Sequence, residues 1–223
     1  MAKKHFIFIL YLLLPLLLTV LLSVHTLFQK DSLEQLNEAI RRNEKATIYA
    51  ILNSPFTPNL DPPYRFGELN KPLFLAARFS DTQVIEWLLN AGADINGICS
   101  YEDTPLITAL EHQQYENARY LIEKGADVNK PNLFGYSPFI GLSEYGPLDL
   151  FELALANGGD VNKAHPCLVS TCKPGAMNET PLEKAKKVND QSLFSSMEEY
   201  QNVLHTRKQI QEILIQHGAK NTP

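Results

Sequence analysis

Two short motifs recur along the chain with the same period. The segments NAGADIN (90–96), EKGADVN (123–129) and ANGGDVN (156–162) end alike, and their glycines, Gly92, Gly125 and Gly158, are evenly spaced. The segments KPLFLAA (71–77), TPLITAL (104–110) and SPFIGLS (137–143) each carry a proline, and these prolines recur at the same interval as the glycines. Two markers in phase over three units indicate a repeat protein, in which each unit contacts only its neighbours.

Each unit is predicted to contain two short helices. A proline suits the first turn of a helix, and Thr104, Ser137 and Thr180 are placed to cap that turn. The recurrent glycines fall just past a helix end, where a left-handed residue is favoured. Apolar residues occur at helical spacing between these signals, for example Val84, Ile85, Leu88 and Leu89. The predicted fold class is therefore all-α.

These motifs resemble the ankyrin repeat, whose unit of about 33 residues has a T-P-L-H opening, two antiparallel helices and a G-A-D-x-N close. The resemblance covers about residues 33–223. It implies an ankyrin-repeat solenoid of helix-turn-helix units with hairpin loops, which we expect to occupy residues 29–223. The expected units are about 32–59, 71–96, 104–129, 137–162 and 180–221.

The chain departs from the ankyrin pattern in two ways. The histidine of the opening is replaced by Phe74, Ile107, Ile140 and Glu183 in the four openings. We therefore expect fewer hydrogen bonds between repeats, and apolar contacts that carry more of the stability. The last unit is also stretched, by one insertion before its opening and by a longer one between its helices. Its C-terminal part predicts one long helix that covers the open end of the stack.

An apolar run near the N-terminus predicts a membrane segment. Residues 6–24 read FIFILYLLLPLLLTVLLSV, 19 residues without a charge, and a helix of that length is about 28 Å long, close to the hydrocarbon thickness of a bilayer. Lys3 and Lys4 precede the run, which favours a cytoplasmic N-terminus. We expect residues 1–28 to be a cytoplasmic tail and a transmembrane signal anchor, with a periplasmic or otherwise extracytoplasmic body. The alternative is a cleaved signal peptide and a secreted or periplasmic protein.

Signals for catalysis are lacking in the sequence. The formal net charge is −5, so no basic excess indicates nucleic acid. The sequence contains no glycine-rich phosphate loop, no H-E-x-x-H and no G-x-S-x-G. We therefore predict a protein that is not an enzyme, with no catalytic residue, cofactor, metal site or small-molecule substrate.

The resemblance implies binding of a partner protein by the hairpin loops and the concave face of the inner helices. Several loop residues are apolar or aromatic, the types that dominate interface hot spots, although one or two of them could pack against an adjacent hairpin instead. The predicted partner-binding residues are Arg78, Phe79, Tyr101, His112, Gln113, Leu133, Phe134, Tyr136 and Tyr145.

We expect a membrane-tethered array that binds an unidentified protein in the periplasm or lumen. One alternative is a structural scaffold of a membrane complex that acts through the long C-terminal helix. Another is an exported protein, freed by signal cleavage, that protects or neutralises an enzyme.

The chain has three cysteines, Cys99, Cys167 and Cys172. Cys99 falls two repeats before the others, roughly 20 Å away at one helix diameter per repeat, whereas a disulfide requires Cα atoms within about 7 Å. Cys167 and Cys172 are therefore the predicted disulfide pair, in a compartment that permits oxidation. Free thiols, or a metal or redox site that includes His165, are the alternatives.

Overall fold

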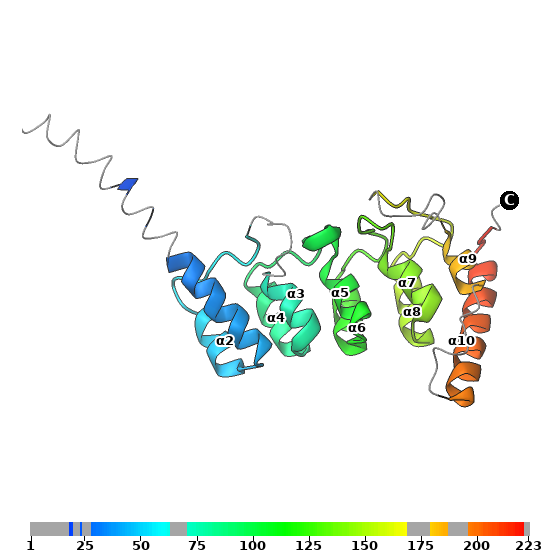
Figure 1. Ribbon diagram of the computed structural model, residues 1–223, viewed down its shortest axis with the longest axis horizontal. Helices are drawn as coiled ribbons and strands as arrows, with labels where there is room; N and C mark the ends of the chain where they lie inside the picture. The colour runs from blue at the N-terminus through cyan, green and yellow to red at the C-terminus, as the bar shows by residue number, and fades with distance from the viewer. Residues whose placement is uncertain are drawn as a thin grey trace, which may run out of the picture.

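In a computed structural model, the chain is a row of antiparallel helix pairs that stand side by side (Figure 1). The structure describes residues 18–19, 23, 28–62, 71–168, 179–186 and 196–220. Helical residues 28–41 pair with α2 (Lys45–Leu52). The later elements are α3 (Pro72–Phe79), α4 (Thr82–Asn90), η1 (Ser100–Glu102), α5 (Pro105–Glu111), α6 (Tyr115–Glu123), α7 (Pro138–Tyr145), α8 (Leu148–Ala156), α9 (Pro181–Lys186) and α10 (Met197–Gln216).

The described residues contain helices and no strands, so the predicted all-α class is confirmed there. Within the same residues, no helix combines the length and the apolar character needed to cross a membrane. The predicted transmembrane helix at 6–24 lies outside the described residues except for Leu18, Thr19 and Ser23. The first helix includes residues 28–31, which precede the unit expected at 32–59.

The inner helices start as their sequences predict. Prolines occupy the first turn of α3, α5 and α7. The Thr104 hydroxyl accepts a hydrogen bond from the Ile107 amide at 3.2 Å, which caps α5, and Ser137 caps α7 in the same way. At α9 the cap is reciprocal: Thr180 Oγ1 accepts from the Glu183 amide, and Glu183 Oε2 accepts from the Thr180 amide at 2.7 Å. Glu183 thus completes a capping box at the position of the family's histidine.

The outer helices end at the recurrent glycines. Gly92, Gly125, Gly158 and Gly218 have φ values of +94°, +91°, +91° and +83°. This left-handed conformation costs glycine little and other residues more, so it ends each helix and turns the chain towards the next repeat.

One continuous apolar core runs through the row, from Leu36 in the first helix to Leu214 in α10. The positions where the family has histidine are also buried: Phe74, Ile107 and Ile140 are at most 2% exposed. Phe139 and Phe151 stack with ring centroids 5.2 Å apart and join α7 to α8. Buried apolar side chains therefore occupy the histidine position in these three repeats.

A ladder of asparagine side chains links successive repeats, contrary to the expectation of sparse hydrogen bonding. The Oδ1 atoms of Asn96, Asn129 and Asn162 accept the backbone N–H of the equivalent turn one repeat later, at 2.8–2.9 Å. Asp61 does the same for the Asp94 amide at 2.8 Å. Asn129 Nδ2 also donates to the Gly158 carbonyl at 2.8 Å.

Each turn in this ladder is closed by its own aspartate. The carboxylates of Asp94, Asp127 and Asp160 accept the amide two residues further on, at 2.8–3.0 Å. These local bonds fix the turn conformation. The asparagine at the end of each turn is thereby held in position to reach the next repeat.

The long C-terminal helix covers the end of the stack as predicted. Helix α10 has 20 residues, packs on α7, α8 and α9, and buries Arg207, Ile210 and Leu214. A buried ion pair joins α7 to α9, with Lys184 Nζ 3.1 Å from Glu144 Oε2. Arg207 Nε donates to the Glu144 carbonyl at 2.8 Å and so binds the end of α7 to α10.

The ladder predicts that Asn129→Ala destabilises the protein by about 2 kcal/mol, because two hydrogen bonds between repeats are lost. Urea unfolding followed by circular dichroism measures this loss. Asn157→Ala is the matched control, since Asn157 is exposed and its Nδ2 donates to the Leu153 carbonyl in its own helix. Equal losses in the two variants would contradict a stabilising role for the ladder.

Candidate binding surface

The hairpin at residues 130–136 is organised by the buried side chain of Asn132. Its Oδ1 accepts from the amides of Phe134 and Tyr136, both at 3.0 Å. Its Nδ2 donates to Asp103 Oδ1 in the preceding hairpin at 2.7 Å. Burial raises the pKa of the Asp103 carboxyl, and the bond from Asn132 opposes that rise. Asn132 therefore sets the shape of its own hairpin and its position relative to the one before it.

Backbone hydrogen bonds join three consecutive hairpins at their tips. The Leu133 amide donates to the Tyr101 carbonyl at 2.8 Å, and the Leu168 amide donates to the Leu133 carbonyl at 2.7 Å. The rings of Tyr101 and Phe134 also contact, with centroids 5.2 Å apart. Four residues separated by up to two repeats in sequence thus form one surface.

This surface, which we call the tip surface, consists of Tyr101, Leu133, Phe134 and Leu168. Tyr101 is 41% exposed and Leu168 is 69% exposed, while Leu133 and Phe134 are half-buried. Tyr101 has φ +59°, an uncommon conformation for an aromatic residue that presents its side chain at the hairpin tip. Leu168 was not predicted as a site residue. The only indication in the sequence is that an apolar residue follows Cys167.

Tyr136 does not lie on the tip surface. Its hydroxyl packs directly against Gly141 of α7, where a Cβ would overlap it, and the side chain is half-buried. Burial, and then the carboxylates of Glu111 and Glu144, raise the pKa of the phenol. The sequence left open that one or two aromatics pack against an adjacent hairpin, whereas Tyr136 packs against the helix of its own repeat.

The other predicted residues lie at the opposite edge of the row, where each inner helix ends. Arg78 and Phe79 close α3, His112 and Gln113 follow α5, and Tyr145 closes α7. We call these five residues the turn-end group. An inner helix of eight residues is about 12 Å long, so the structure keeps the turn-end group apart from the tip surface.

Local contacts orient the turn-end group. The Arg78 guanidinium lies over the Phe79 ring, 4.7 Å from its centroid. Partial burial, and then the charge of Arg78, lower the pKa of His112. Phe79 is 43% and Tyr145 is 57% exposed. The Arg207 guanidinium approaches the Tyr145 ring to 5.2 Å.

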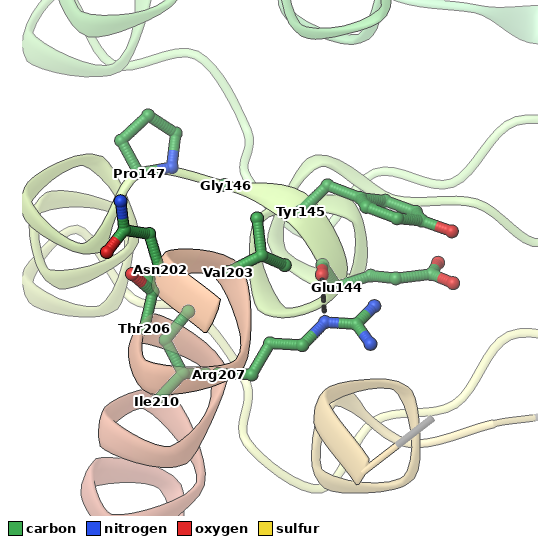
Figure 2. A pocket seen from close by; sticks show the side chains of 9 residues that line it. All are labelled: Glu144, Tyr145, Gly146, Pro147, Asn202, Val203, Thr206, Arg207 and Ile210. Atoms are coloured by element: carbon green, nitrogen blue, oxygen red, sulfur yellow. Dashed lines mark hydrogen bonds between the residues drawn. The ribbon is translucent and has the colours of Figure 1, made fainter. Parts of the chain in front are cut away.

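A shallow cleft of about 230 Å³ lies between the end of α7 and α10. Figure 2 shows Arg207 reaching across it to the Glu144 carbonyl. Ligand pockets are usually about 300–1,000 Å³, so this cleft is small for a metabolite. It is lined by Glu144, Tyr145, Gly146, Pro147, Asn202, Val203, Thr206, Arg207 and Ile210.

The cysteines lie near the hairpins. Cys99 is a free, buried thiol, and burial raises its pKa to about 12. Cys167 is disulfide-bonded. Cys172 lies outside the described residues, so the Cys167–Cys172 pair stays a prediction. The described residues hold no group of three side chains suited to a metal ion.

The segment at His165 and Pro166, in the hairpin after α8, packs closely on the preceding hairpin at Gly135. Gly135 has φ +76°, and a Cβ there would overlap the His165 carbonyl. We predict that Gly135→Ala separates these segments, which accelerates amide exchange at Leu168. Gly125→Ala is the control, because it has φ +91° and an open site; both variants lose about 1–2 kcal/mol from the left-handed backbone. Unchanged exchange at Leu168 in Gly135→Ala would contradict the packing.

Comparison with known proteins agrees with the repeat architecture. Residues 36–132 match the family model for ankyrin repeats in three copies. The match includes α2, whose unit lacks the T-P-L-H opening, and ends at Asn132, before α7. No curated protein matches the chain. Residues 36–132 therefore carry three ankyrin repeats, a kind of module that binds proteins and is generally not enzymatic.

Proposed function

We propose that this chain is a membrane-tethered ankyrin array that binds a partner protein in the periplasm or lumen through its tip surface. The observation that carries the proposal is the tip surface itself, in which the exposed Tyr101 and Leu168 and the half-buried Leu133 and Phe134, from three hairpins, are held together by backbone hydrogen bonds. Surfaces ordered before binding lose less conformational entropy when a partner docks. Apolar and aromatic anchors of this kind dominate measured hot spots.

The partner is proposed to extend from the tip surface towards the inner helices. A stable protein–protein interface buries about 800 Å² on each side, which is more than four side chains provide. Phe79 and Tyr145 are exposed at the far ends of the inner helices and would be reached by a larger partner. In this proposal the tip surface supplies most of the affinity, and the turn-end group supplies additional contacts.

Helix α10 is less suited to a scaffolding role than the tip surface is to binding. Its buried residues Arg207, Ile210 and Leu214 face α7, α8 and α9, so its apolar face is already used within the chain. Deleting it would expose the core and would not test scaffolding cleanly. Exposed residues such as Ile215, which is 57% exposed, provide a cleaner test of α10.

The binding proposal predicts that Leu168→Ser weakens the complex about tenfold, the usual effect of losing one interface anchor. A photoreactive residue at 168 or 101 should first capture the partner in cells, so that the affinity can then be measured with purified protein. Ile215→Ser is the matched control, an equally simple change at an exposed aliphatic residue on α10. If Ile215→Ser weakens binding and Leu168→Ser does not, scaffolding through α10 replaces this proposal.

The tether and the compartment are further parts of the proposal. They are supported by the uncharged run at 6–24 and by Lys3 and Lys4 before it. A protein with a cleaved signal peptide, which protects or neutralises an enzyme, is the alternative. In that alternative, the mature protein lacks the apolar run at 6–24, which the tethered form retains.

An extracytoplasmic location predicts both the activity of a fused reporter and the oxidation of Cys167 and Cys172. A reporter that is active only outside the cytoplasm, fused after Pro223, should be active. Alkylation of the unreduced protein from its native compartment, followed by mass spectrometry, should leave Cys167 and Cys172 unmodified. Two alkylated thiols at these positions, or a silent reporter, would contradict the proposed topology. Intact mass distinguishes the tethered chain from one cleaved after the apolar run.

A further inference from the structure

Two exposed phenylalanines contact each other at the N-terminal end of the row. Phe28, in the first helix, and Phe56, in the loop after α2, are 53% and 59% exposed. Their rings meet edge to face, with centroids 5.7 Å apart. Single exposed apolar residues are common on protein surfaces, whereas two exposed rings in contact begin an apolar patch, and large patches mark protein or membrane interaction sites. We call these two residues the Phe28–Phe56 pair.

Hydrogen bonds hold the pair in place. The Asn59 amide donates to Gln29 Oε1 at 3.0 Å, which fastens the loop after α2 to the start of the first helix. Within the loop, Thr57 Oγ1 donates to the Leu52 and Ser54 carbonyls at 3.1 and 2.9 Å. These bonds fix the backbone that carries both rings, so the two exposed rings keep their positions relative to each other.

The pair lies close in sequence to the uncharged run. Four residues lead from Val24, the last residue of the run, to Phe28. Even a fully extended chain spans only about 14 Å over four residues. The headgroup layer on each side of a bilayer is about 5–8 Å thick. If residues 6–24 occupy the hydrocarbon core, Phe28 is within reach of the headgroups, and Phe56 is in contact with Phe28.

We propose that the Phe28–Phe56 pair inserts into the interfacial layer of the bilayer and sets the orientation of the array on the membrane. This inference rests on the tether proposed above. Phenylalanine is among the residues that interfacial segments bury at the boundary between headgroups and acyl chains. Lys30, exposed two residues after Phe28, supplies a cation for anionic headgroups. The anchor and the pair would then hold the array at two places, which restricts its tilt more than the anchor alone would.

Tryptophan fluorescence of the full chain in vesicles tests the proposal. The chain has one tryptophan, Trp87, so Trp87→Phe provides a silent background, and its thermal unfolding is first compared with that of the unchanged chain. Phe28→Trp and Phe56→Trp then report on the pair. Ile215→Trp is the control, since Ile215 is similarly exposed on α10, at the other end of the row. The vesicles contain phosphatidylcholine with a minor fraction of phosphatidylglycerol.

The expected result is a blue-shifted emission at 28 and 56, with loss of fluorescence when the phosphatidylcholine is brominated and protection from aqueous iodide. Ile215→Trp should show none of these effects. If the chain floats with the vesicles but position 56 behaves like 215, the inference is wrong and the tether stands. Protection from iodide without quenching by brominated lipid would mean that protein, such as a second copy, covers the pair, which also overturns the inference. A chain that does not float with the vesicles overturns the tether and the inference together.

Discussion

Hydrogen bonds from one repeat to the next determine how the helix pairs are spaced. A single pair of helices this short has too small an apolar face to be stable, so the interfaces between repeats must supply the stability. Apolar contacts are non-directional and fix the spacing of neighbouring helices only loosely. The side chains of Asn96, Asn129 and Asn162 provide direction, because each reaches the next turn at 2.8–2.9 Å. The positions of the hairpins, and hence of the tip surface, follow from this spacing.

Much of the fold could be predicted from the sequence because its signals are local. A proline and a preceding hydroxyl mark the start of α5 and α7, and a left-handed glycine follows α4, α6, α8 and α10. The asparagine ladder was missed for the opposite reason. In the sequence, Asn129 reads as an ordinary turn residue. Only the stacked repeats show that its side chain bonds the Asp160 amide and the Gly158 carbonyl of the next repeat.

The binding surface was harder to predict. Tyr101 and Phe134 do lie together, because equivalent hairpins are adjacent in a stack. Tyr136 follows Phe134 by two residues, yet its ring turns towards Gly141, a distinction that depends on the hairpin conformation set by Asn132. Leu168 lies in an insertion, where the repeat period offers no reference for its position.

The contacts at the end of α7 have a consequence for the order in which the protein is completed. The rungs that start from Asn96 and Asn129 join residues 31 positions apart, so each forms soon after the next repeat has been synthesised. The buried carboxylate of Glu144 instead waits for Lys184, 40 residues later, and its carbonyl waits for Arg207, 63 residues later. Because chains fold from the N-terminus as they emerge, the first repeats would assemble early while α7 remains unfinished. Until the C-terminal helices have been made, the end of α7 therefore carries the Glu144 carboxylate without the lysine that neutralises it in the folded protein.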